Sequence, residues 1–373
     1  METGKIKLLG LALLTGSLTL HAQDNDSKGK PVTVPVRISV VPGLSTQGNN
    51  DVNTTSQFSL NIYGGITGSV NGVEVGSLFN IDKKNVQYAQ AAGLFNMVGG
   101  NFTGVQAGGL FNSVGANVKG VQAAGLSNFV KKNVRGIQVS GIQNFAGQKL
   151  EGIQAAGISN FAGNNVRGIQ VAGISNISKS GTAGIQVSGI VNYARHLKGL
   201  QVGLINIADT SDGFSVGLLT FVKKGYHKIS LYSSEVLNMN IAWRSGNAKL
   251  YNILMVGINA GTDNKAFSYG YGIGHAIELG NRLSINPEIT AQYMYLGNWH
   301  YFNVLSKFHV VLNLELVKGV SVFVAPSFTA WYTEQKDPVH GYKFKLPSDN
   351  YHSFNLWNNV DGWIGWSAGI TFF

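Results

Sequence analysis

The sequence predicts an all-β protein, and two periodic patterns are the observations behind that prediction. Between Gly72 and about Ala208 one motif returns every 16 residues, as in residues 104–112 and 120–128. From Phe267 onward apolar and polar residues alternate with a period of two, which is the spacing of a strand with one apolar face. A short fixed repeat indicates an array of one supersecondary unit, in which each copy buries its apolar face on its neighbours.

The composition excludes several classes of protein. Of the 373 residues 49 are glycine, only 12% are charged and none is cysteine. The absence of cysteine excludes disulfides, thiolate metal sites and cysteine nucleophiles. After the N-terminus no apolar run reaches about 18 residues, so no membrane-spanning helix is expected. The net charge of +10 lies mostly in turns such as residues 131–133, which indicates solvated turn charge rather than nucleic-acid binding.

The N-terminal residues 1–22 have the three parts of a secretory signal peptide. Two lysines precede an apolar stretch over residues 8–20, and a small residue then offers the cleavage point. A short buried helix is the alternative interpretation, but a charged and polar tract follows at once. Residues 23–56 are therefore expected to be a polar, loosely ordered segment of an exported chain, with residues 32–41 as a candidate short strand.

The C-terminal part, residues 209–373, carries the pattern of a transmembrane β-barrel. Its strands are expected to be ten or more residues long, apolar on one face and polar on the other, with aromatic residues near their ends. Strands of a soluble sandwich usually have about five or six residues, and their outer face carries more charge. The expected strands are residues 267–279, 283–295, 307–316, 320–332 and 364–373. The polar residues 333–362 are expected to form a long external loop.

Sixteen residues fit two kinds of repeat unit. The favoured interpretation makes each copy one strand plus one turn, so that residues 57–208 form successive strands of an outer-membrane-type antiparallel β-barrel, with Gln opposite Asn. The period shortens to 15 at Gln201 and to 14 at Asn206 and continues without a linker, which favours a continuous barrel. The alternative is a repeat β-solenoid joined to a C-terminal barrel, in which each Gln and Asn stacks on its own copy in an amide ladder.

Glutamine and asparagine recur in every copy although neighbouring positions vary, so we expect both to be structural. In either arrangement each amide is hydrogen-bonded by its neighbour, and one substitution leaves an unpaired buried amide. Gln138→Leu, in a central copy, is therefore expected to lower stability more than Gln90→Leu at the edge of the array. The polar rows are Gln106, Gln122, Gln138, Gln154 and Gln170, with Asn112, Asn128, Asn144, Asn160 and Asn176.

The repeat also resembles that of a known family. Its pattern is Gly-Val/Ile-Gln-x-x-Gly-Leu/Ile-x-Asn, preceded by Phe-Ser-Leu-Asn-Ile-Tyr-Gly-Gly at residues 58–65. This looks like the surface-repeat outer-membrane proteins of the Bacteroides group and of spirochaetes. The resemblance covers the repeat block and, less specifically, the C-terminal strands. It implies export and an outer-membrane or surface location, and it implies no activity, so no functional residue is transferred from the family.

No catalytic, cofactor-binding or metal-binding residue is expected. Residues 213–217 match the G-x-S-x-G nucleophile motif, but nothing helical follows them, and Ser215 aligns with the repeat glutamine. His275 and Glu278 are three apart in a strand, which puts them on opposite faces and argues against a shared metal. A hydrolase that pairs Ser215 or Ser233 with a loop histidine is not favoured by any feature of the sequence.

The expected function is that of a non-enzymatic outer-membrane or surface β-protein, structural or pore-like, with loops available for surface contacts. The alternative is a surface adhesin or binding module presented by a repeat solenoid, because solenoids offer extended binding faces. The expected partners are outer-membrane lipid and the barrel-assembly machinery, together with a surface ligand that the sequence does not identify. No nucleic acid and no cofactor are expected.

Overall fold

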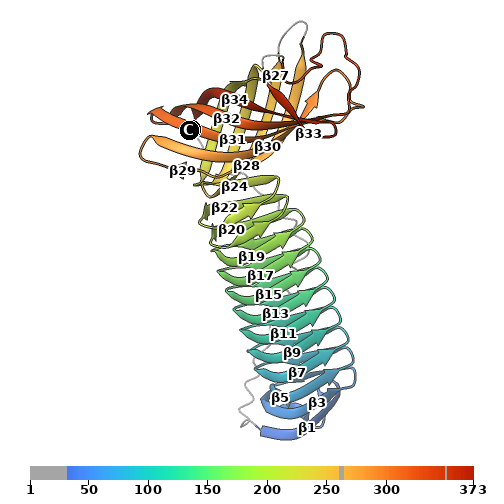
Figure 1. Cartoon of the computed structure of the whole chain (residues 1–373). Helices are drawn as coiled ribbons and strands as arrows, with labels where there is room; N and C mark the ends of the chain where they lie inside the picture. Colours follow the sequence, from blue (N-terminus) through green and yellow to red (C-terminus); the bar gives the residue numbers. More distant parts are fainter. Residues whose placement is uncertain (1–31, 260–263, 349–350) are drawn as a thin grey trace, which may run out of the picture.

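The computed structural model describes residues 32–259, 264–348 and 351–373, which form a β-solenoid followed by a closed barrel (Figure 1). The solenoid has about 10 turns and the barrel has 8 antiparallel strands. The all-β class is confirmed, and so is the arrangement expected as the alternative, a repeat solenoid joined to a C-terminal barrel. The expected signal peptide, residues 1–22, lies outside the described residues.

Each solenoid coil consists of two strands, and each strand pairs in parallel with the matching strand of the next coil. The first series is β1 (Val32–Val41), β3 (Thr54–Asn61), β5 (Ser69–Gly76), β7 (Val86–Ala92), β9 (Phe102–Gly108), β11 (Val118–Ala124), β13 (Val134–Ser140), β15 (Leu150–Ala156), β17 (Val166–Ala172), β19 (Thr182–Ser188), β21 (Leu200–Val202) and β23 (Phe214–Val216). The second series is β4 (Gly64–Thr67), β6 (Phe79–Asp82), β8 (Phe95–Val98), β10 (Phe111–Val114), β12 (Ser127–Val130), β14 (Gln143–Ala146), β16 (Ser159–Ala162), β18 (Ser175–Ser178), β20 (Val191–Leu197), β22 (Ile205–Ser211) and β24 (Leu219–Val222). The first coil adds β2 (Leu44–Ser45), antiparallel to β1, and one 3-10 helix, Gly48–Asn53.

Parallel pairing keeps the coils in register, so residues of one kind stack on one another along the axis. Gln122 of β11 has Gln106 of β9 and Gln138 of β13 as its pairing partners. A turn at residues 125–126 separates β11 from β12, whose Asn128 pairs in the same way with its own copies. Because this turn divides each central copy into strands of 7 and 4 residues, neither strand is long enough to cross a membrane. The favoured expectation, in which the copies are successive antiparallel barrel strands with Gln opposite Asn, is therefore wrong.

One glycine in each repeat is required by the close stacking of the coils. Gly104, Gly120 and Gly136 have φ values of 126°, 138° and 139°, in the region that favours glycine. A Cβ atom at Gly120 would lie 1.9 Å from the carbonyl oxygen of Gly104 in the preceding coil. The glycine thus allows the backbones of successive coils to approach as closely as the ladder pairing demands. Tyr88, with φ of 81°, occupies the same position one coil earlier.

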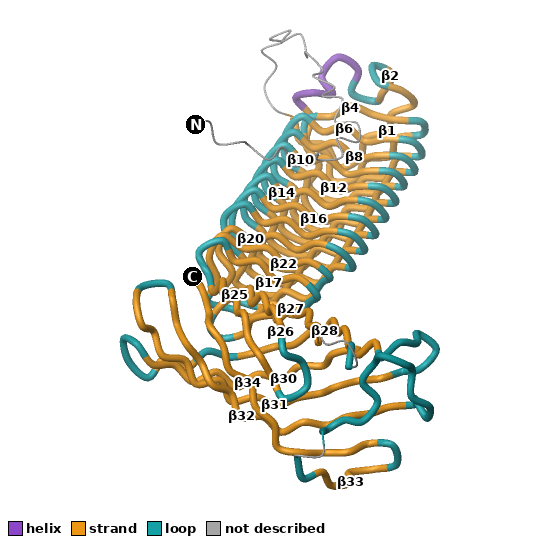
Figure 2. The backbone as a smooth tube through the Cα atoms, turned by 90° about the horizontal axis from the view of Figure 1, so that it is seen from above, coloured by secondary structure: helices purple, strands orange, loops and turns teal. Residues whose placement is uncertain are grey.

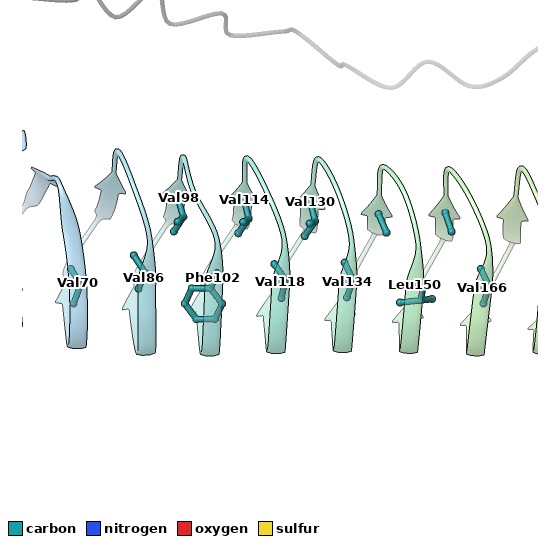
Figure 3. Close-up of a cluster of buried hydrophobic side chains, with 12 residues drawn as sticks. Val70, Val86, Val98, Phe102, Val114, Val118, Val130, Val134, Leu150 and Val166 are labelled. Carbon is teal, nitrogen blue, oxygen red and sulfur yellow. The ribbon is translucent and has the colours of Figure 1, made fainter. Parts of the chain in front are cut away.

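The apolar core of the solenoid consists of two rows of buried side chains, most of them valine. Figure 3 shows Val118 and Val134 stacked in one row and Val114 and Val130 in the other. All four side chains are buried, and an amide row lies beside each of them on the same inward face. The interior is therefore half polar, and its stability depends on the hydrogen bonding of those amides as well as on apolar burial.

The solenoid reaches beyond the repeat block in both directions. It begins with β1, which confirms the candidate strand at residues 32–41, and it ends with β24, so it extends past residues 57–208 at both ends. The shortened periods near Gln201 belong to the last coils, whose strands β21 and β23 have only 3 residues each. These coils keep the parallel register, so the change in period does not mark a change of fold.

The barrel follows directly after β24, and its first and last long strands pair with each other to close it. Its strands are β25 (Tyr226–Ser234), β26 (Met239–Asn247), β27 (Leu250–Asn259), β28 (Ala266–Gly274), β30 (Leu283–Tyr295), β31 (Asn303–Val317), β32 (Val320–Thr333) and β34 (Val360–Phe372), with the short β29 (Ile277–Glu278) and β33 (Ser353–Trp357) pairing with β30 and β34. Four of the five expected strands are present as single strands, and residues 283–295 have the expected bounds, whereas the expected strand 267–279 is divided into β28 and the short β29. The expected loop, residues 333–362, is shorter than expected, because β33 and the start of β34 form a hairpin within it.

The turns of the solenoid form two rows of loops along its length, with the barrel at one end (Figure 2). We call one row the leucine edge; it contains the turns within each coil, such as residues 125–126. We call the other row the basic edge; it contains the turns between coils, such as residues 131–133. The two edges repeat their chemistry once in every coil, so any ligand that follows an edge meets the same kinds of group repeatedly.

Candidate functional site

The glutamine row forms a hydrogen-bonded ladder through the middle of the solenoid. Gln122 Nε2 donates to Gln106 Oε1 at 2.7 Å, and Gln138 Nε2 donates to Gln122 Oε1 at 2.9 Å. The same hydrogen bond, from each glutamine to the one before it, joins Gln106 to Gln90 and continues from Gln138 through Gln154, Gln170, Gln186 and Gln201. Each amide donates to the preceding coil, so the row has one direction along the whole array.

The asparagine row forms a second ladder that runs in the opposite direction. Asn112 Nδ2 donates to Asn128 Oδ1 at 2.9 Å in the following coil and to the carbonyl oxygen of Ala123 at 2.7 Å. The link to the following coil recurs through Asn80, Asn96, Asn128, Asn144, Asn160, Asn176, Asn192 and Asn206. Both amide hydrogens therefore have an acceptor, as buried polar groups require. The ten polar-row residues named from the sequence all lie in these two ladders.

Near the N-terminus each ladder ends at a charged side chain. The hydrogen-bonding groups of that side chain, donors in one case and acceptors in the other, match the direction of the ladder. Arg37 Nη1 donates to Asn61 Oδ1 at 2.8 Å, and Asn61 Nδ2 donates to Asn80 Oδ1 at 2.7 Å, so a donor-only group begins the asparagine ladder. Gln90 Nε2 donates to Glu74 Oε2 at 2.8 Å, so an acceptor-only carboxylate ends the glutamine ladder. The charges thus complete the hydrogen bonding of two opposed amide chains.

The same coils hold a buried group of charged residues. Arg37 pairs with Asp51 at 2.8 Å, and Gln90 Nε2 also donates to Asp82 Oδ2 at 2.5 Å. Burial, followed by the nearby Glu74 carboxylate, raises the pKa of Asp82 well above its usual value. Asp82 is therefore the group in this cluster whose protonation the fold favours. The arrangement is a structural cap, because its side chains are turned into the coil and buried.

Sequence reasoning missed this cap, although the repeat contained a signal for it. Glu74 lies one period before Gln90 and replaces the glutamine, and Asp82 lies one period before Val98 and replaces an apolar core residue. Charged residues at core positions of a terminal coil indicate the end of a stack. Arg37 lies before the strict repeat begins, so its place in the cap could not be found by counting.

The barrel interior contains two buried ion pairs. Arg244 Nε and Nη2 donate to the two carboxylate oxygens of Glu288 at 2.7 and 2.9 Å, and Tyr251 Oη donates to the same carboxylate at 2.8 Å. Lys307 Nζ lies 2.7 Å from Glu235 Oε1 in a second buried pair. These pairs are strongly hydrogen-bonded, as charges removed from water must be.

Little space remains between these side chains. A cavity lined by Arg244, Glu288, Thr290 and His309, with other inward residues, has a volume of about 10 Å³. A space of this size holds at most one water molecule. Eight-stranded barrels are also just wide enough for side chains to fill. The pore-like form of the expected function therefore finds no support in the barrel interior.

The barrel exterior is apolar where its interior is polar. On β30, Glu288 and Thr290 are buried inside, whereas Ile289 between them is 60% exposed on the outside. Val256 and Ile364 are 54% and 65% exposed on other strands. The outward row also includes Leu231, Met239, Ile241, Ile258, Phe267, Tyr269, Phe308, Val324, Phe328, Trp366 and Ile370. This inversion of the usual pattern is typical of barrels that face lipid.

The solenoid attaches to the barrel at the rim that has the tightest turns. At this rim β26–β27 and β31–β32 are joined by two residues each, and both ends of the barrel strand path lie there. Asn247 Nδ2 donates to the carbonyl oxygen of Gly213 at 2.6 Å, and Tyr271 Oη donates to that of Gly217 at 2.8 Å. Asn252, an outward residue of β27, also donates to Gly217 and is buried by the contact. The last coils are thus fixed to the barrel wall by hydrogen bonds.

The residues considered for catalysis or metal binding are not brought together. Ser215 is buried in β23, where its hydroxyl donates to Gln201 Oε1 at 3.3 Å and so extends the glutamine ladder. His275 lies just beyond β28, with Nδ1 2.9 Å from the carbonyl oxygen of Lys249. Among the described residues no group of three or more His, Asp or Glu side chains has the spacing of a metal site.

The two edges of the solenoid differ in chemistry. The leucine edge carries one exposed leucine or isoleucine in each coil, namely Leu78, Leu94, Leu110, Leu126, Ile142, Ile158, Ile174, Ile190, Leu204 and Leu218. The basic edge instead carries lysine, arginine and asparagine, all of them turned to solvent or partly exposed. Two polar hollows lie along the basic edge, one lined by residues that include Asn101 and the other by residues that include Asn165.

Neither a related protein nor a membrane-spanning helix indicates the function of the described part of the chain. In the described part of the chain no helix is long and apolar enough to span a membrane. Comparisons with family models, with curated proteins and with solved structures find no match for this chain. The function must therefore be argued from the solenoid and the barrel themselves.

Proposed function

We propose that this protein is a non-enzymatic binding module, presented by the repeat solenoid and anchored in an outer membrane by the barrel. The observation that carries the proposal is the inverted barrel, with ion pairs such as Arg244–Glu288 inside and exposed residues such as Ile289 outside. An apolar exterior of this extent is unfavourable in water and favourable in lipid. The filled interior supports an anchor rather than a channel.

The solenoid is the part of the chain that suits binding. About 10 coils at a spacing of about 4.8 Å give it a length of roughly 45–50 Å, with both edges continuous along it. Stacked repeats commonly use such extended surfaces for recognition. The side chains inside the solenoid are committed to the two ladders, so its ligand chemistry must lie on the outer surface.

The lengths of the turns at the two rims of the barrel support a proposal for the side of the membrane on which the solenoid lies. Outer-membrane barrels turn tightly on the periplasmic side and carry their longer loops outside. Here the solenoid is attached at the tight-turn rim, while the opposite rim carries residues 296–302 and 334–348. We therefore propose that the solenoid extends into the periplasm, which differs from the adhesin expected at the cell surface.

Because the chain has no cysteine, single cysteines can test both parts of this proposal. Lys336→Cys adds a thiol to an exposed residue of the loop rim, and Lys132→Cys adds one to the basic edge. In intact cells a membrane-impermeant maleimide should label the first variant only, and it should label both once the outer membrane is permeabilised. Urea should not extract either variant from the membrane fraction.

The opposite labelling pattern would reverse the proposed side while leaving the anchor in place. Extraction of the chain by urea, or its recovery in a soluble fraction, would contradict the anchor. Two further variants test the anchor directly. Ile289→Asp and Val256→Asp should weaken membrane integration, because each puts a carboxylate on the surface proposed to face lipid. Asp substitutions at exposed Lys83 and Lys84 of the solenoid should leave integration unchanged.

A further inference from the structure

We propose that the basic edge binds a linear glycan that carries carboxylates, and that the polymer lies along the solenoid axis. The inference rests on the proposed function, since it assigns a ligand class to the solenoid. Its first support is charge. Between residues 83 and 198 the exposed cations of the edge are Lys83, Lys84, Lys119, Lys131, Lys132, Arg135, Lys149, Arg167, Lys179, Arg195 and Lys198. Glu151 is the single acidic residue between the first and last of these, and it lies 3.8 Å from Arg135.

The order of these cations fits a linear ligand. Lys119, Arg135, Glu151 and Arg167 are successive pairing partners, so they form one row parallel to the axis. From Lys83 to Arg195 the edge spans seven coil steps, roughly 30–35 Å at about 4.8 Å per coil. A compact anion would contact only two or three rungs of this row, whereas an extended polyanion can contact its whole length. Arginine in such a row can bind carboxylate through two parallel hydrogen bonds.

A row of side-chain amides accompanies the cations. Asn117 Nδ2 donates to Asn101 Oδ1 at 2.9 Å, and Asn133 Nδ2 donates to Asn117 Oδ1 at 2.8 Å, in an outer ladder beside the basic turns. An asparagine amide has two N–H groups, and this ladder uses one of them. The second N–H of each rung is suited to a ligand hydroxyl or carboxylate oxygen. The amides therefore add hydroxyl recognition to the charge of the edge.

Two hollows on the basic edge combine both kinds of group. One has a volume of about 310 Å³ and is lined by residues that include Asn101, Asn117, Thr103 and Lys119. The only Phe, Tyr or Trp in its lining is Phe102, which is fully buried. Single-stranded nucleic acids bind on exposed aromatic platforms, and this hollow offers none. Hydroxyl-bearing, anionic chains fit the lining better.

The second hollow repeats this combination further along the same edge. It has a volume of about 320 Å³, and its lining includes Asn165, Arg167, Ser180, His196 and Lys198. Its amide, hydroxyl and cationic groups match those of the first hollow in kind. Two hollows of like chemistry on one continuous edge indicate a ligand that repeats its own groups, as a polysaccharide does. The leucine edge has no comparable charge.

The experiment measures binding of the purified full chain in detergent to three polymers. Polygalacturonate supplies hydroxyls and carboxylates, its fully methyl-esterified form supplies the same backbone without charge, and polyphosphate supplies charge without sugar. We expect polygalacturonate to bind and the ester not to bind. A variant with Lys119→Gln, Arg135→Gln, Arg167→Gln and Lys198→Gln should lose at least about tenfold in affinity, since it removes several charge-assisted hydrogen bonds.

A control variant removes four exposed cations that lie in the barrel, away from the edge: Lys265→Gln, Arg282→Gln, Lys318→Gln and Lys336→Gln. Its affinity should stay within about twofold, because these charges lie away from the row. The pair Asn101→Ala and Asn117→Ala keeps the charge and should weaken polygalacturonate binding while leaving polyphosphate binding unchanged. Melting temperatures of all variants report whether the solenoid remains folded.

Equal losses in the edge and control variants, equal binding of the ester, or an amide pair without effect would each overturn the glycan proposal. So would failure of polygalacturonate to bind a chain that passes the membrane and labelling tests above, and in that case the proposed anchored module would still stand. A chain that binds polygalacturonate but is extracted by urea would instead overturn the anchor. The two proposals can therefore fail separately.

Discussion

The solenoid and the barrel both bury polar side chains, but they satisfy them in different ways. Along the solenoid axis parallel, in-register stacking makes every residue the neighbour of its own copy, as with Gln122 between Gln106 and Gln138. A group that stacks on itself must be both donor and acceptor, which an amide is and a charged group is not. In the barrel unlike residues meet across the interior, so Arg244 can pair with Glu288.

This difference explains where each part of the molecule holds charge. In the solenoid the fully buried charges, Arg37, Glu74 and Asp82, are confined to the first coils, where the stack ends and a self-complementary neighbour is absent on one side. In the barrel buried charges occur along the interior. In the middle of the array each buried polar residue stacks on identical copies on both sides, which favours neutral amides. At the end of the array one identical neighbour is missing, so a charged residue can be accommodated there.

The largest expected effect comes from breaking a buried charge pair in the barrel. Arg244→Met leaves Glu288 buried without its cation, which should lower the free energy of unfolding by about 3–5 kcal/mol, measured by urea titration in detergent. The double variant Arg244→Met with Glu288→Leu should recover most of the loss. The exposed solenoid pair is the control, since Arg135→Gln should cost only about 0–1 kcal/mol. Comparable losses in Arg244→Met and Arg135→Gln would contradict this comparison.

The next effect lies in the glutamine ladder. Gln138→Leu should cost about 1–3 kcal/mol, because it removes one donor and one acceptor from a buried chain. Gln90→Leu should cost more, because Gln90 donates to both Glu74 and Asp82 and its loss leaves two buried carboxylates without that donor. The structure thus reverses the order expected from the sequence, where Gln90 was at the edge of the array. Thermal unfolding of the two variants decides it, and a smaller loss for Gln90→Leu would restore the sequence-based order.

The barrel could be predicted from the sequence because its alternating pattern directly records burial. Residues 283–295 form one strand with the expected bounds, and Glu288 and Ile289 face inward and outward as the period of two requires. The hairpin of β33 was missed because its alternation of polar and apolar residues spans only residues 353–356, within a longer polar segment. Its pairing with β34 is a contact that only the folded chain reveals.

The solenoid was expected only as the alternative, because a period of 16 residues gives the spacing of copies but not the direction of their pairing. The amide ladders distinguish parallel from antiparallel stacking, and they require that Gln meets Gln. In the sequence, the strict recurrence of both amides was the feature that indicated parallel stacking. The shortened periods near Gln201 wrongly favoured barrel strands. In the shorter coils β21 and β23 have only 3 residues each, whereas β20 and β22 lengthen to 7, and the parallel register is kept.

A smaller effect is expected at the other end of the glutamine ladder. Ser215 donates to Gln201 Oε1 at 3.3 Å, so Ser215→Ala should cost about 0.5–1.5 kcal/mol, the usual contribution of one hydrogen bond. Ser215→Asn would keep a donor at this position and should retain more stability than the alanine variant. Urea unfolding measures both. A loss as large as that of Gln138→Leu would show that the ladder is not more sensitive in its centre than at its end.

The smallest effect is a pH dependence confined to the first coils. The pKa of Asp82 is raised by burial and by Glu74, so the folded state holds this proton more tightly than the unfolded state does. Between the unfolded pKa, about 3.9, and the raised folded value, the folded chain binds more protons, so its stability falls as pH rises. Hydrogen exchange of the β5–β7 amides, corrected for intrinsic rates, should show opening becoming easier from acid toward neutral pH. Asp82→Asn should remove this dependence on pH, whereas Glu151→Gln, on the exposed edge, should retain it. If protection in the parent chain instead rises with pH, Asp82 is held ionised by Arg37 and Gln90.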